Sequence, residues 1–358
     1  MATSMKPRPE QLGIRSKLGE IREIERKQGP AAAERALVAM LREGEQSHTA
    51  FLALARVLMK QQKYEDATRA ATKAKALAPL EADSSTLLGL IALRQKDIDA
   101  AAAGFADAIR LDPNSTRAYL GAAAVKLETG QYEEAVALCE RCLSMDPSME
   151  QAHEMLARIR LKQGEKGAAA DELKSIVMRN PDNKKALKAY VRLMREEDRG
   201  DEVLEMLEAD LQASPDDRKK TERYARVAAR VGRTDAAVQQ YEKMAEAGSP
   251  RVADKVRYAM ALIQAGEMVK ARVMIDQLGQ KKVLRPIAAK LLGDIALAEG
   301  DAAGAVQAYT RACTAARVPM LDPDEVTAAE GIEDLAKRWR AHTQESIGAA
   351  LRQRRAAS

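Results

Sequence analysis

Aromatic residues are scarce in this chain, because Phe, Trp and Tyr together make up 3% of its 358 residues. Hydrophobic residues still reach 46%, so Ala, Leu and Met must fill the core, which suits closely packed helices. The sequence shows no strand pattern and no Gly-rich phosphate loop, which argues against a nucleotide-binding fold. No apolar run reaches the roughly 18 residues that a membrane span requires.

Cysteine is also rare, and three cysteines, an odd number, do not make a disulfide framework. The start of the sequence lacks the apolar segment of a secretory signal. These features predict a cytoplasmic protein with reduced thiols. The 58 Lys and Arg residues nearly balance the 53 Asp and Glu residues, so the net charge of +5 does not by itself indicate nucleic acid.

An internal repeat of 34 residues dominates what is present. Residues 82–115 and 116–149 align without a gap, and the same register begins units at 48, 82, 116, 150, 184, 218, 252 and 286. The aligned positions include Leu88-Gly89 with Ala122-Ala123, Ala101 with Ala135, Phe105 with Cys139 and Pro113 with Pro147. The pattern resembles the tetratricopeptide repeat, whose units are helix pairs that must stack to bury their apolar faces.

Small residues recur where the two helices of each unit are expected to touch. A glycine at one phase also marks the turn in five units, where a positive φ costs little. The turn glycines are Gly130, Gly164, Gly232, Gly266 and Gly300. The first-helix slot reads Ala55, Gly89, Ala123, Ala157, Val191, Ala225, Ala259 and Gly293. The second-helix slot reads Ala67, Ala101, Ala135, Ala169, Val203, Ala237, Ala271 and Ala305.

The resemblance implies an all-α fold: a right-handed TPR superhelix (an α-solenoid) of about eight to nine helix-turn-helix repeats with a C-terminal capping helix. We predict a disordered N-terminus at 1–10, a degenerate first repeat at 11–47, and a capping helix with a basic tail at 320–358. Eight 34-residue units fill residues 48–319, at 48–81, 82–115, 116–149, 150–183, 184–217, 218–251, 252–285 and 286–319.

The unit at 184–217 departs from the pattern. It has Val in both small slots, and Asp210 replaces a small or apolar residue. Its turn glycine, Gly200, comes two residues late. Either the repeat has drifted, or the curvature of the array changes at this unit.

The C-terminal segment reads as a separate helical region. Pro323 begins a helix, with acidic residues in its first turn. Farther on, Trp339 shares one helical face with Ile332, Leu335, Ile347 and Leu351. That face either covers the last repeat or presents the single Trp to a partner.

Residues that could carry chemistry are few. Cys139 and Cys142 form a CxxC motif, but they occupy packing slots in mid-helix and have no second ligand pair, so we predict buried structural thiols. His48, His153 and His342 are isolated. Nothing pairs carboxylates in a pocket. We therefore predict a protein that is not an enzyme and that has no cofactor and no metal site.

In repeats of this family the first helices line a concave groove. The inward positions that this implies are apolar in the units from 48 to 149, basic in the next three and apolar again in the last two. The apolar positions are Leu52, Met59, Leu90, Leu93, Leu120 and Leu127, and then Val256, Met260, Ile263, Ile287 and Leu297. The basic positions are Arg158, Lys162, Lys185, Lys188, Arg192, Arg195, Lys219, Arg223, Arg226 and Arg230, opposed by Glu154, Glu196 and Glu222.

The heat-shock chaperone adaptors of this family clamp a C-terminal carboxylate with Lys, Asn and Arg residues from three units. Lys219 and Arg223 resemble the third-unit half of that clamp. Glu154 and Ala189 depart from it, and the three Asn residues lie between units. The clamp is therefore at best half present.

These observations predict a non-catalytic scaffold or adaptor that binds a protein partner, with an acidic or extended segment, in the groove. Ordinary solvated helix faces are the competing interpretation of the same cations. A self-assembling structural protein that forms homo-oligomers is an alternative, based on the apolar positions near the C-terminal end. A nucleic-acid binder, using these cations with Arg352, Arg354 and Arg355, is a lesser alternative because the groove lacks aromatic stacking platforms.

Overall fold

The computed structural model describes residues 9–44, 46–248 and 251–357; residues 1–8, 45, 249–250 and 358 lie outside the described part of the chain. The chain divides into two compact units, Met1–Tyr190 and Val191–Ser358. Helices make up both units, and no strand occurs among the described residues. The predicted all-α fold of stacked helix pairs is confirmed.

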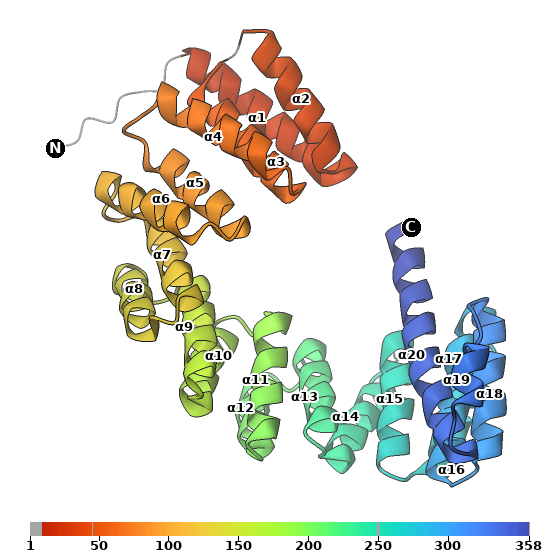
Figure 1. The fold of residues 1–358 in the computed structure, drawn as a ribbon. Coiled ribbons are helices and arrows are strands. Elements are labelled where there is room, and N and C mark those ends of the chain that lie inside the picture. The colour runs from red at the N-terminus through yellow and green to blue at the C-terminus, as the bar shows by residue number, and fades with distance from the viewer. Residues whose placement is uncertain (1–8, 45, 249–250, 358) are drawn as a thin grey trace. The chain divides into compact units, whose positions relative to one another are not determined.

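In the first unit each helix packs against the next along the chain, and α1, α3, α5, α7 and α9 also contact one another in that order (Figure 1). The odd-numbered helices therefore form one layer and the even-numbered helices pack on it. The helices are α1 (Pro9–Gln28), α2 (Pro30–Arg42), α3 (His48–Lys60), α4 (Tyr64–Leu77), α5 (Ala82–Arg94), α6 (Ile98–Leu111), α7 (Thr116–Glu128), α8 (Tyr132–Met145), α9 (Glu150–Gln163) and α10 (Lys166–Arg179).

Helix α11 (Lys184–Glu196) crosses the division between the units. In the second unit α12 to α18 pack in chain order, and α13, α15 and α17 also contact one another in order. The helices are α12 (Gly200–Gln212), α13 (Arg218–Arg230), α14 (Thr234–Glu246), α15 (Val252–Gln264), α16 (Met268–Gly279), the 3₁₀ turn η1 (Lys282–Leu284), α17 (Arg285–Ala298), α18 (Ala302–Ala316), α19 (Pro323–Thr327) and α20 (Ile332–Ala357).

The first helices of the pairs α3, α5, α7, α9, α11, α13 and α15 begin at residues 48, 82, 116, 150, 184, 218 and 252. These starts favour the predicted division into 34-residue units, which remains our interpretation. Residues 1–8 of the predicted disordered N-terminus lie outside the described residues, whereas Pro9 and Glu10 already belong to α1.

The turns between paired helices share a left-handed residue every 34 positions. The five predicted turn glycines have φ between 76° and 87°. The corresponding residues of the other three units are Gln62, Lys96 and Asp198, with φ of 62°, 63° and 56°. The conformation is thus a property of the repeat, and it is kept even where an L side chain makes it unfavourable by roughly 1–2 kcal/mol.

The prediction that Gly200 serves as a late turn glycine is wrong, because Asp198 takes the positive φ and Gly200 begins α12. A Cβ atom on Gly200 would lie 2.8 Å from the Cβ of Val231, at the end of α13. Glycine is therefore needed here because α12 starts close against Val231, and not for its backbone freedom.

The predicted small slots are all buried. At Gly89 a Cβ atom would lie 3.0 Å from the ring of Phe105, and at Gly293 it would lie 2.5 Å from the ring of Tyr309. In these pairs an aromatic ring from the second helix fills the space that the missing methyl leaves. The prediction that small residues let the paired helices approach is confirmed.

The C-terminal helix α20 covers the last repeat, since it packs against both α17 and α18 (Figure 1). Trp339 is 7% exposed and packs in a cluster with Tyr309 and Leu321. Asp294 joins the cap to α17 and α18, because its carboxylate accepts hydrogen bonds from the Tyr309 hydroxyl at 2.9 Å and from Arg340 Nε at 3.1 Å. The covering role is confirmed, and Trp339 is not a surface anchor.

Candidate partner-binding site

The ten predicted cations divide between the two compact units. Arg158, Lys162, Lys185 and Lys188 belong to the first unit, and the other six belong to the second. Within each helix they are spaced three or four residues apart: 158 and 162 on α9, 185, 188, 192 and 195 on α11, and 219, 223, 226 and 230 on α13. Because an α-helix turns once per 3.6 residues, each set lies on one face of its helix.

Most of these side chains are free to meet a partner. Eight of the ten are exposed, the exceptions being the half-buried Arg226 and the buried Arg223. Lys185 is paired with Glu154 at 2.8 Å, and Arg192 lies 3.6 Å from Glu196. The cations without an ion-pair partner among the described residues are Arg158, Lys162, Lys188, Arg195, Lys219, Arg226 and Arg230.

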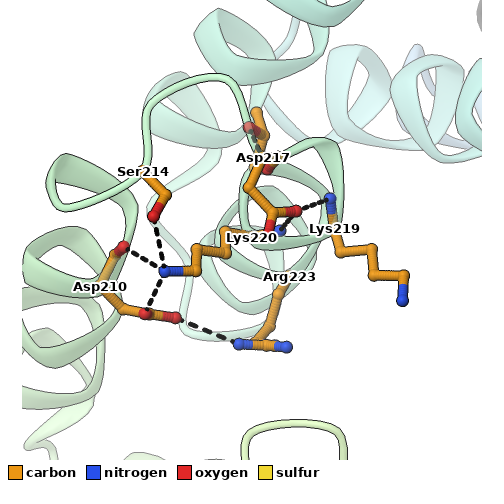
Figure 2. Close-up of polar contacts among 7 residues, drawn as sticks. Asp210, Ser214, Asp217, Lys219, Lys220 and Arg223 are labelled. Atoms are coloured by element: carbon orange, nitrogen blue, oxygen red, sulfur yellow. Dashed lines mark hydrogen bonds and ion pairs between the residues drawn. The ribbon is translucent and has the colours of Figure 1, made fainter.

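Arg223 differs from its neighbours because its charge is already compensated. Figure 2 shows Arg223 and Lys220 both reaching the carboxylate of Asp210 on α12, at 3.2 Å and 2.7 Å. The side chain of Lys219 points away from this cluster, and its amino group makes no contact in the view. Of the two residues that resemble half of a carboxylate clamp, Lys219 is thus the one open to a ligand.

Three cations crowd the start of α13, which is unfavourable because a helix N-terminus carries partial positive charge. Asp217 offsets this, since its carboxylate accepts hydrogen bonds from the backbone N–H groups of Lys219 at 2.8 Å and Lys220 at 3.4 Å (Figure 2). Capping by Asp217 is therefore what allows so basic a sequence to begin a helix.

Arg226 lies farther along the same face of α13, and other cations lie near it. Burial lowers the pKa of its guanidinium below the ordinary value, and the nearby cations Arg257 and Arg230 lower that pKa further, while Glu222 acts against them. Arg257 itself pairs with Glu222 and lies 3.3 Å from Asp254. Arg226 is therefore a half-buried cation whose charged form is disfavoured by burial and by its neighbours.

The apolar positions predicted for the groove in the first three units behave unequally. Leu52 and Leu127 are buried, at 4% and 7% exposure, so they belong to the core. Met59 and Leu90 line a cavity of about 390 Å³ bounded by α1, α3, α5 and α7. Its wall also carries cations that the sequence analysis did not select, namely Arg22, Arg56, Lys60 and Arg117.

These cations were missed because the prediction took apolar positions from the three units and ignored charged neighbours one turn away. Arg56 lies 3.6 Å from Asp83, and Lys60 is paired with Glu25 at 2.6 Å. Arg22 and Arg117 are exposed and have no ion-pair partner among the described residues. Near the C-terminus Met260 is 43% exposed, whereas Val256, Ile263, Ile287 and Leu297 are half-buried.

The cysteines take no part in a surface site. Cys139 and Cys142 are free and buried, as predicted. Burial raises the pKa of Cys139 to about 12, with Cys142 adding to the effect, and burial raises the pKa of Cys142 to about 11. Among the described residues no group of three His, Cys, Asp or Glu side chains could hold a metal ion. No described helix is long and apolar enough to cross a membrane.

Family comparisons agree with this architecture. Models described as the tetratricopeptide repeat match residues 52–116, 92–159 and 126–189. The chain contains tetratricopeptide repeats, at residues 52–189. These matches fall almost entirely in the units that begin at 48, 82, 116 and 150, where both small slots hold only Ala or Gly. A search of curated proteins finds no match to this chain.

Several solved structures are similar to parts of this chain. TTC0263 of Thermus thermophilus is 19% identical over 52% of this chain and 98% of its own, with a TM-score of 0.46. PilW, a type IV pilus biogenesis factor, is 18% identical over 67% and 93%, with a TM-score of 0.44. MamA of Desulfovibrio magneticus is 17% identical over 48% and 96%, with a TM-score of 0.40.

Proposed function

We propose that this chain is a non-catalytic scaffold whose first helices bind an acidic or extended segment of a partner protein. The observation that carries the proposal is the basic face of α13. Lys219, Arg226 and Arg230 lie on that face without an ion-pair partner among the described residues. Burial is the main cause of the lowered pKa of Arg226, and carboxylates of a partner would offset the further lowering by Arg257 and Arg230.

Cations of the same sign lie on α9 and α11. Arg158, Lys162 and Lys188 are exposed and unpaired among the described residues, whereas Lys185 is partly neutralised by Glu154. The ten cations stay our proposed partner-binding residues, with Arg223 contributing least because Asp210 compensates it. The free, buried cysteines suit a reducing compartment, and the cytoplasm is the location that we propose.

The experiment compares two triple charge reversals in affinity capture from native lysate, read by mass spectrometry. The first variant carries Lys188→Glu, Lys219→Glu and Arg230→Glu, all at exposed and unpaired first-helix positions. The matched control carries Lys73→Glu, Arg141→Glu and Arg311→Glu, at exposed positions on the second helices α4, α8 and α18. Both variants change the net charge equally, and circular dichroism checks that both keep their helicity.

We expect a partner that the wild type and the control capture and that the first variant loses. Raising the salt from about 0.1 M to about 0.5 M should weaken the same capture, since exposed charges are screened. A partner retained by the first variant and indifferent to salt would overturn the electrostatic proposal. Recovery of the protein alone would favour self-assembly, and a gel shift with single-stranded nucleic acid at low salt would favour the third candidate.

A further inference from the structure

A cavity of about 770 Å³ opens between α12 and α14 and has α13 as its floor. Arg218, Thr221 and Tyr224 of α13 line it. Because an α-helix advances 100° per residue, these three positions lie on the face of α13 opposite the basic face at 219, 223, 226 and 230. The cavity is therefore separate from the site proposed above.

The walls of this α12–α14 cavity combine aliphatic and acidic side chains. Leu211, Pro215 and Met244 supply apolar surface. Glu208 and Asp216 are exposed carboxylates with no ion-pair partner among the described residues. The cations compensate them poorly, because Arg218 is paired with Asp254 at 2.7 Å and Lys243 is the one remaining base in the lining.

Tyr224 gives a second, independent indication of a ligand. Its residue is 8% exposed, yet its hydroxyl has no hydrogen-bond partner among the described residues. Burial raises the pKa of Tyr224, and the charge of Glu208 raises it further. Tyr224 and Glu208 both line the cavity. The hydroxyl is not one of the buried polar atoms that lack a partner among the described residues, so it is open to the cavity and available to a polar group from outside the chain.

We propose that the α12–α14 cavity binds an arginine or lysine side chain presented by a segment of a second partner protein. The aliphatic stem would pack against Leu211 and Met244, as long cationic side chains do on apolar surface. The cationic head would pair with Glu208 and Asp216 and donate a hydrogen bond to the Tyr224 hydroxyl.

Charge complementarity favours this occupant over an acidic or neutral one. Residues 200–217, which form α12 and the loop after it, contain seven acidic residues and no Lys or Arg. Asp201, Glu202 and Asp210 are ion-paired. Glu208 and Asp216 have no ion-pair partner among the described residues, and these two cavity carboxylates favour a cation over the acidic segment proposed for the first-helix face. The site thus extends the scaffold to two partners of opposite charge, and it does not depend on the first.

The test uses the full chain and the peptide acetyl-Ala-Leu-Arg-Leu-Ala-amide, titrated by NMR against ¹⁵N-labelled protein. The matched probe replaces Arg by citrulline, which keeps the shape and removes the charge. We expect saturable shifts at α12 and α14 with the Arg peptide, and binding about tenfold weaker with the citrulline peptide, the loss typical of one charge-assisted hydrogen bond.

Four variants separate a binding role from a structural one. Glu208→Gln with Asp216→Asn should weaken the Arg peptide about tenfold, and Tyr224→Phe about threefold. Lys243→Gln should strengthen binding about threefold, a change that partial unfolding would not produce. Asp235→Asn, at the far end of α14 and outside the cavity lining, is the control and should change nothing.

Equal binding of the two peptides, absence of saturable binding, or insensitivity to the Glu208 and Asp216 changes would each overturn the proposal. Spermidine that binds as tightly as the Arg peptide would overturn a protein segment as the occupant. The reversal of Lys188, Lys219 and Arg230 should leave the peptide affinity unchanged. Failure of the first-helix proposal and failure of this one are therefore distinguishable.

Discussion

Asp210 on α12 accepts a 3.2 Å ion pair from Arg223 on α13, a cation that is only 8% exposed. The same carboxylate is paired with Lys220 at 2.7 Å. Asp210 lies at a position that is small or apolar in the other repeats. There it neutralises two cations of α13 at the interface between two helix pairs.

Removing that carboxylate should destabilise the second unit. We expect Asp210→Ala to lower the free energy of unfolding by about 3 kcal/mol, because it removes a carboxylate that neutralises a buried Arg. The double variant with Arg223→Met should recover most of the loss. Urea unfolding followed by circular dichroism measures both. Glu205→Ala, an exposed change on the same helix, is the control, and an equal loss there would contradict the role assigned to Asp210.

The left-handed turns predict a stabilising substitution. Asp198 has a φ of 56°, so Asp198→Gly should raise the free energy of unfolding by roughly 0.5–1 kcal/mol. Gly232→Ala, at a φ of 87°, should lower it by about 1 kcal/mol or more. Thermal unfolding compares the two. As a control, Gly19→Ala inside α1 meets nothing within 4 Å and should stabilise its helix.

Gly121 on α7 should be intolerant of a methyl group. A Cβ atom there would lie 2.1 Å from the ring of Phe105 on α6. We expect Gly121→Ala to cost about 1–3 kcal/mol through overpacking. Phe105→Leu should cost less on the Gly121→Ala background than on the wild type, because the smaller side chain removes the clash. A double-mutant cycle by urea unfolding gives this coupling, and strictly additive losses would show that the ring is not the obstacle.

Thiol reactivity should follow the raised pKa values of Cys139, near 12, and Cys142, near 11. At pH 8 a chromogenic disulfide reagent should label them at least about a hundredfold more slowly in the native protein than after unfolding. Labelling should accelerate as the pH rises. The unfolded thiols ionise near pH 8.5, so the folded state should lose stability above that pH.

An exposed cysteine on the same helix provides the control for this measurement. Ser144→Cys on α8 places a thiol at an exposed position, where it should react at the rate of an ordinary thiol. Rapid labelling of Cys139 in the wild type at pH 8 would show that the helix opens readily and would contradict the structural role.

The packing of α20 on the last repeat predicts a large loss of stability when Trp339 is replaced. Trp339→Ala should lower the free energy of unfolding of the C-terminal helices by about 3–5 kcal/mol, since the ring is 7% exposed. Ile332→Ala, on the same helix at 50% exposure, should cost less than about 1 kcal/mol. In the wild type the Trp fluorescence should shift to longer wavelength when the cap detaches. Equal costs for the two changes would argue against the packing described.

The sequence predicts the helix pairs well because their contacts depend on local size rules. Gly89 against Phe105 and Gly293 against Tyr309 follow from the repeat period, since the ring and the gap recur at fixed positions. The positive φ of Asp198 could not be predicted from the sequence. An Asp in a polar turn does not by its identity indicate a left-handed backbone conformation. The sequence therefore favours Gly200 as the turn residue. In the structure Gly200 is a glycine because α12 starts close against Val231.

The candidate site is harder to predict than the fold. Arg223 shares the spacing of its exposed neighbours, but a partner on another helix, Asp210, decides that it is compensated. Leu52 and Leu127 share the spacing of groove residues, but contacts with neighbouring helices bury them in the core. Arg22 and Arg117 lie in different repeats, and only the cavity that α1 and α7 both border brings them to one surface.

The segregation of charge between neighbouring helices has a consequence for encounters in solution. Residues 200–217 hold seven acids and no bases, and residues 218–230 hold six bases and one acid. Packed helices lie about 8–10 Å apart, close to the Debye length of about 8 Å at physiological ionic strength. We therefore expect this pair of helices to act as an electric dipole that would orient the molecule toward a charged partner, so that the two proposed partners would approach on different faces.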